Sequence, residues 1–95
     1  MEYNFDQVHN YYERLVFEEV ARRAQAEEFS GFSSEMLADV ACLALNRLPP
    51  RYVRHDVDMM FYLTEPERQA MEQALEEVLK FSFDLVRERT ARSAR

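Results

Sequence analysis

Apolar residues recur at steps of three and four near the start of the chain, and this spacing predicts an amphipathic helix over residues 5–26. Asn4 followed by Gln7 three residues later resembles a capping box, with Asp6 as an alternative cap. The apolar stripe consists of Val8, Tyr12, Leu15, Val16, Val20 and Ala24.

A second helix is predicted over residues 35–47, where apolar residues cover most of the circumference, as is typical of a central helix. Its alanines, Ala38, Ala41 and Ala44, allow a neighbouring helix to approach closely. We expect this helix to end before Pro49, because a residue that precedes proline avoids the α conformation.

The stretch EEFSGFSS predicts a turn between these two helices. Gly31 stands where a helix end commonly needs a positive φ angle. We expect Phe29 and Phe32 to hold the turn against the core, and Ser33 or Ser34 to cap the helix that follows.

Apolar and polar residues alternate from Tyr52 to Leu63, and this period of two predicts an extended or β segment. The sequence shows no obvious second strand, so an isolated strand here would leave a row of backbone groups unpaired. Two alternatives remain open. The segment pairs with its counterpart in another copy about a two-fold axis, or it lies as an arm across the helices.

A third helix is predicted from Thr64, which with Pro66 and Glu67 forms a strong start signal, to about Arg89. We expect the basic tail from about residue 90 to be frayed. Phe81 and Phe83 fall outside the predicted core stripe, which comprises Met71, Leu75, Val78, Leu79, Ser82, Leu85 and Val86.

These elements predict one mainly α domain over residues 1–95, with three main helices and one extended segment between the second and the third. The second and third helices carry more apolar surface than a single core of this size needs. We therefore expect a homodimer.

The charge balance narrows the possible partners. A net charge of −6 disfavours direct binding of long nucleic acid, which normally requires a basic surface. It permits a small phosphorylated ligand, which needs only a few well-placed arginines. The sequence has no apolar run long enough to span a membrane and no signal peptide, so a cytoplasmic location is expected.

The sequence gives little indication of a catalytic site or a metal-binding site. The single cysteine, Cys42, lies in an apolar helical run and is expected to be a buried, inert thiol. Alternation places Asp56 and Asp58 opposite His55, so we expect no metal site. No serine or cysteine is spaced with a histidine for nucleophilic catalysis, and we expect no enzyme activity.

The candidate ligand site surrounds Pro49 and Pro50. Arg47, Arg51 and Arg54, together with Tyr52, flank this rigid pair; guanidinium groups bind phosphate bidentately, and both residue types stack on bases. A purely structural role is the alternative: Arg47 would meet helix carbonyl groups, Tyr52 would lie in the core, and Arg54 would be solvated.

The segment DVACLALNRLPPRYV, residues 39–53, resembles the signature of the late-competence ComFB family. The resemblance implies a small, largely helical, dimeric bacterial protein, and some similar members are cyclic-dinucleotide receptors, chiefly for cyclic di-GMP. Carried over by position, the motif implicates Asn46, Arg47, Pro49, Arg51 and Tyr52. Other members carry zinc-binding cysteines between the first two helices. This chain has none there, so zinc is not carried over.

Two functions are therefore expected as alternatives. The first is a non-enzymatic signalling protein that binds a cyclic dinucleotide and relays it to an unidentified regulatory partner. The second is a protein–protein interaction module in which the proline turn is structural.

Overall fold

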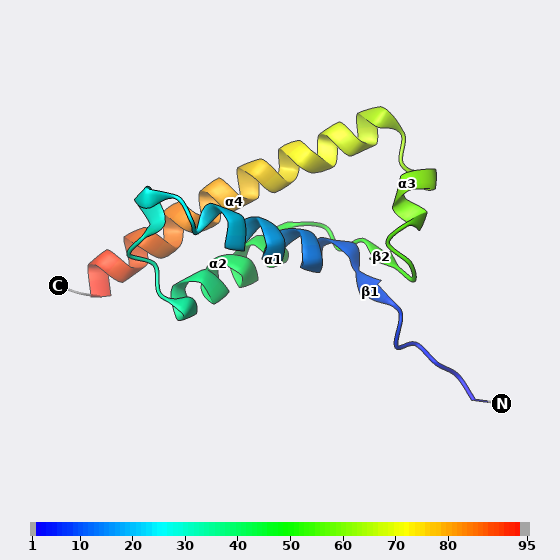
Figure 1. The fold of residues 1–95 in the computed structure, drawn as a ribbon, viewed down its shortest axis with the longest axis horizontal. Helices are drawn as coiled ribbons and strands as arrows, with labels where there is room; N and C mark the ends of the chain where they lie inside the picture. The colour runs from blue at the N-terminus through cyan, green and yellow to red at the C-terminus, as the bar shows by residue number, and fades with distance from the viewer. Residues whose placement is uncertain (1, 94–95) are drawn as a thin grey trace.

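The computed structural model describes residues 2–93 and confirms a mainly α fold. Figure 1 shows the longest helix running along the molecule, with two shorter helices beside it. The elements are β1 (His9–Asn10), α1 (Tyr11–Arg23), the 3₁₀ turn η1 (Glu27–Phe29), α2 (Ser34–Arg47), β2 (Tyr52–Val53), α3 (Asp58–Tyr62) and α4 (Glu65–Ser93). No helix within residues 2–93 is long and apolar enough to cross a membrane.

The core lies where α2 packs between α1 and α4. Leu79, Phe83 and Val86 of α4 are buried there, and Phe83 was wrongly expected outside the stripe. The rest of the buried cluster comes from the other helices and the end of α2: Tyr12, Val16, Val20, Val40, Ala41, Ala44 and Leu48. Close packing of this kind is the main source of stability in a domain of this size.

Helix α1 begins later than the sequence predicts. Asn10 is the cap, because its side-chain oxygen accepts a hydrogen bond from the Tyr12 backbone N–H at 3.2 Å. Asn4 forms a separate local bond to the Asp6 N–H, so the predicted capping box is wrong. Val8 remains 47% exposed and does not belong to the buried stripe.

The turn between α1 and α2 is held as expected. The Phe29 and Phe32 rings lie 4.3 and 5.5 Å from the ring of Phe83, centre to centre, and Ser33 caps α2 through a 3.1 Å bond from the Met36 N–H. The expectation for Gly31 is wrong, because no glycine within the described residues has a positive φ. The chain leaves α1 through η1 instead of a left-handed turn.

The predicted extended segment is largely wrong. Only Tyr52–Val53 is a strand, and it pairs within the same chain, antiparallel to β1, with His9 opposite Val53. After a turn the chain forms α3 instead of continuing as a strand. The alternating pattern contains Met59 and Leu63 four residues apart, which is also the spacing of one helical face, and Met59 is buried.

Helix α4 starts as predicted and ends later. Thr64 accepts a hydrogen bond from the Glu67 N–H at 3.3 Å, which confirms the cap. Residues 90–93 are helical, so the frayed tail expected from residue 90 is wrong for them; residues 94–95 lie outside the described part. Cys42 is exposed, not buried, because its side of α2 is left open by the neighbouring helices.

Candidate functional site

The predicted site residues lie on the segment from Asn46 to Arg54, which we call the arginine loop. Leu48 ends α2 in an extended conformation, as expected before a proline, and is buried in the core. Its backbone N–H still donates to the carbonyl oxygen of Ala44 at 3.2 Å. The loop therefore leaves the core from a fixed point.

A second fixed point lies at Arg51. The side-chain oxygen of Asn10 accepts a bond from the Arg51 N–H at 3.0 Å, and the Tyr11 N–H donates to the Arg51 carbonyl oxygen at 2.7 Å. The same Asn10 oxygen caps α1, so one side chain ties the loop to the start of that helix. Asn10 was not predicted as a cap, although an asparagine directly before YYERL is a recognisable cap signal.

The three arginines of the loop are not engaged by carboxylates: within residues 2–93 none of them forms an ion pair. The guanidinium carbon of Arg47 lies 4.0 Å from the centre of the Phe81 ring, a cation–π contact. Burial raises the pKa of Tyr12, and the positive charge of Arg51 acts in the opposite direction. The charge of Arg51 therefore favours the ionised form of the Tyr12 hydroxyl group.

The loop residues do not all converge. Arg47 lies against α4 through Phe81, whereas Arg51 and Tyr52 lie beside β1. Tyr52 is 66% exposed, so its ring is not a core aromatic. The remaining predicted residues, Asn46, Pro49 and Arg54, are exposed. The chain thus offers two separate cationic positions along the loop.

A charged cluster joins β1, α1 and the turn after β2. The His9 Nε2 atom is 2.5 Å from Asp56 Oδ1, and an Arg14 guanidinium nitrogen is 3.4 Å from Asp56 Oδ2. The hydrogen bond to Asp56 is the largest influence raising the pKa of His9. Sequence analysis could not find this pair, because His9 and Asp56 are 47 positions apart.

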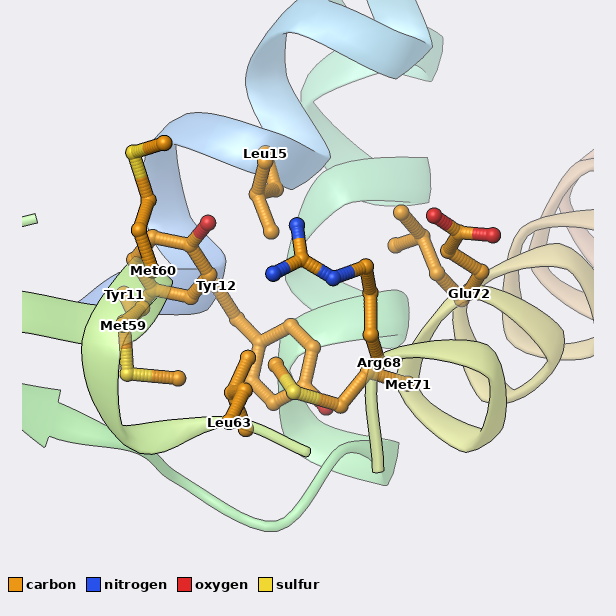
Figure 2. Close-up of a pocket in the computed structure, with 10 residues that line it drawn as sticks. Tyr11, Tyr12, Leu15, Met59, Met60, Leu63, Arg68, Met71 and Glu72 are labelled. Atoms are coloured by element: carbon orange, nitrogen blue, oxygen red, sulfur yellow. The ribbon is translucent and has the colours of Figure 1, made fainter. Parts of the chain in front are cut away.

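A cavity of about 180 Å³, which the sequence did not predict, lies between α1, α3 and the start of α4. Figure 2 shows the side chains that line it. Its wall is largely apolar, with Leu15, Met59 and Met71 among the lining residues. The Arg68 guanidinium points into this space, and its buried Nε atom has no hydrogen-bond partner in the described chain. The nearest carboxylate oxygen, on Glu65, is 3.8 Å from Nε.

A model of the late competence development protein ComFB family matches residues 9–90. The chain belongs to the ComFB family. Comparison with curated proteins and comparison with solved structures both gave no match.

The ComFB match begins at β1 and ends within α4, so it includes both fixed points of the arginine loop and the His9–Asp56 pair. Residues 2–8, which precede it, extend away from the helices in Figure 1. Within residues 2–93, no group of three or more histidine, cysteine or acidic residues is arranged to hold a metal ion.

Proposed function

We propose that this ComFB protein is a non-enzymatic cytoplasmic receptor for a cyclic dinucleotide, with cyclic di-GMP as the first candidate. The observation that carries the proposal is the arginine loop, whose guanidinium groups are not paired with carboxylates in the described chain. Guanidinium groups that are free of internal partners can bind phosphate through paired N–H groups.

The loop suits this role because its backbone is already ordered. Buried Leu48 and the Asn10 clamp fix it at both ends of the Pro49–Pro50 pair. Little conformational entropy is then lost when the side chains bind a ligand. In the proposed complex Arg51 and Arg54 hold phosphate, and the exposed Tyr52 ring covers a guanine face. Arg47 contributes a second cationic surface near α4.

The proposal includes a homodimer, because a two-fold symmetric ligand suits a two-fold symmetric protein. An apolar groove of about 430 Å³ lies between α1 and α2. Ala21, Ala38 and Ala41 are among its lining residues, and Phe17, 53% exposed, lies in the same surface. An isologous interface requires a patch that fits its own copy, and a patch that carries both a large side chain and a hollow has the two features that such a fit needs. A second copy is its proposed occupant.

Calorimetric titration with cyclic di-GMP and cyclic di-AMP tests the receptor. We expect Arg51→Ala to weaken binding by about 1.5–3 kcal/mol, or roughly 10- to 150-fold, because a charge-assisted bond to phosphate is lost. The matched control is Arg89→Ala, which removes an exposed arginine from α4 and is expected to leave the affinity unchanged.

Two results would contradict the receptor proposal. The first is no binding of either dinucleotide at about 100 μM. A dissociation constant of that size corresponds to a binding free energy of about −5.5 kcal/mol. The second is equal affinity of Arg51→Ala and the unchanged protein, which would remove the site from the arginine loop.

The alternative function is a module that binds only protein, and one observation favours it. Helix α3 exposes Met60, Phe61 and Tyr62 in succession, at 68%, 79% and 75%. Contiguous exposed apolar side chains commonly mark interaction sites. In the receptor proposal the same surface is where the regulatory partner binds, so only the dinucleotide titration separates the two functions.

A further inference from the structure

The His9 side chain connects β1 to the turn between β2 and α3. Its Nε2 atom lies 2.5 Å from Asp56 Oδ1, and its Nδ1 atom lies 2.6 Å from the carbonyl oxygen of Gln7. Both ring nitrogens are therefore within hydrogen-bond distance of an oxygen atom.

Both of these partners are acceptors. A backbone carbonyl oxygen has no proton to donate, and an ionised carboxylate has none either. A neutral imidazole carries one N–H and can satisfy only one of the two contacts. The contacts are complete only when both ring nitrogens are protonated, so this arrangement is that of the His9 imidazolium.

The surrounding charges support the same protonation state. Asp56 and the Gln7 carbonyl group raise the pKa of His9, and Glu13 on α1 adds to this effect. Arg14, also on α1, contacts the other oxygen of Asp56 at 3.4 Å. Asp56 therefore keeps a cationic partner on α1 when His9 becomes neutral, whereas β1 loses its only ionic contact with the turn among the described residues.

The sheet held by this contact is small. β1 and β2 pair over two residues each, and a two-stranded sheet is marginally stable by itself in water. Because the strand pair is so short, a charge-assisted hydrogen bond beside it contributes a large share of the free energy that keeps the two strands paired. β2 contains Tyr52 and directly follows Arg51. Loss of the pairing between β1 and β2 therefore also loosens the arginine loop.

We propose that His9 is a protonation-dependent clip. As the imidazolium it fastens β1 to the Asp56 turn and supports the hydrogen bonds that hold Arg51 to Asn10 and Tyr11. The neutral ring keeps only one of its two hydrogen bonds and loses its ionic attraction to Asp56, so the β1–β2 pair loosens. This inference does not rest on the receptor proposal, because it concerns the order of the loop and not what the loop binds.

The sign of the pH dependence follows from the raised pKa of His9. A group whose pKa is higher in the folded state stabilises that state fully below its unfolded value, near 6.5, and this contribution disappears as the pH rises through the folded value. The clip is therefore closed below about pH 6.5 and opens as the pH rises through the pKa of folded His9.

An NMR titration from roughly pH 5 to pH 9 tests the clip across the range where histidines change charge. We expect the His9 ring to titrate at a midpoint above the ordinary histidine value of about 6.5. The Tyr11 N–H, bonded to the Arg51 carbonyl oxygen, should lose protection from exchange several-fold through the same midpoint, after correction for intrinsic exchange.

A pair of matched variants identifies the partner. Asp56→Asn keeps an acceptor oxygen but removes the charge, so the His9 midpoint should fall toward the ordinary histidine value of about 6.5. Asp58→Asn makes the same change two residues later on α3 and should leave the His9 midpoint where it was.

The proposal is overturned if His9 in the unchanged protein titrates at or below the ordinary histidine value of about 6.5. It is also overturned if protection of the Tyr11 N–H shows no step with pH, or if the two asparagine variants behave alike. The titration of the unchanged protein stands even if Asp56→Asn fails to fold. No nucleotide is present, so the result is separate from that of the calorimetric test.

Discussion

Ser82 is the one fully buried polar side chain in the described core, and its hydroxyl group has no hydrogen-bond partner there. A buried polar group without a partner costs free energy on folding, and alanine has the higher helix propensity. We expect Ser82→Ala to raise the free energy of unfolding by about 1 kcal/mol, measured as a higher urea midpoint with an unchanged slope. The control, Ser93→Ala at an exposed position of the same helix, should change it by less than about 0.5 kcal/mol. A lower midpoint for Ser82→Ala would show that the hydroxyl group is hydrogen-bonded in solution.

The first turn of α1 and the arginine loop share one element of support, the Asn10 side chain. Asn10→Ala removes the helix cap and the acceptor for the Arg51 N–H together. We expect the free energy of unfolding to fall by about 1–2 kcal/mol, the usual cost of a lost cap, with faster exchange of the Arg51 amide. Chemical denaturation and hydrogen exchange measure the two effects. Asn10→Asp, which keeps an acceptor oxygen, is the matched control and should retain most of the stability; equal loss in both variants would contradict the assignment.

The whole molecule is proposed to be a homodimer, and its oligomeric state in solution tests this proposal. Ala38→Glu places a charge in the apolar groove between α1 and α2, where a second copy is proposed to bind. Burying an unpaired carboxylate at an interface is strongly unfavourable, so we expect this variant to be a monomer by light scattering and the unchanged protein to be a dimer. Ala70→Glu, at an exposed position on α4, should remain dimeric. A concentration-independent monomer for the unchanged protein would contradict the homodimer.

Local signals in the sequence predicted the helices better than the connections between them. The Thr64 and Ser33 caps lie within three residues of the groups that they bond, so sequence spacing alone reveals them. The β1–β2 pair is two residues long on each side and has no periodic pattern to detect. The alternation before Leu63 predicted a strand where the structure has α3, because the spacing of Met59 and Leu63 fits both a strand and one helical turn.

The helical class and the family signature could be predicted from the amino-acid sequence, because each depends on residues near one another along the chain. The clamp of Asn10 on Arg51, the contact of His9 with Asp56 and the exposure of Cys42 follow from how the folded chain packs. Contacts across more than 40 positions depend on how α1 and the arginine loop pack together. Periodicity in the sequence reports which face of an element is apolar, and packing decides which neighbour covers it.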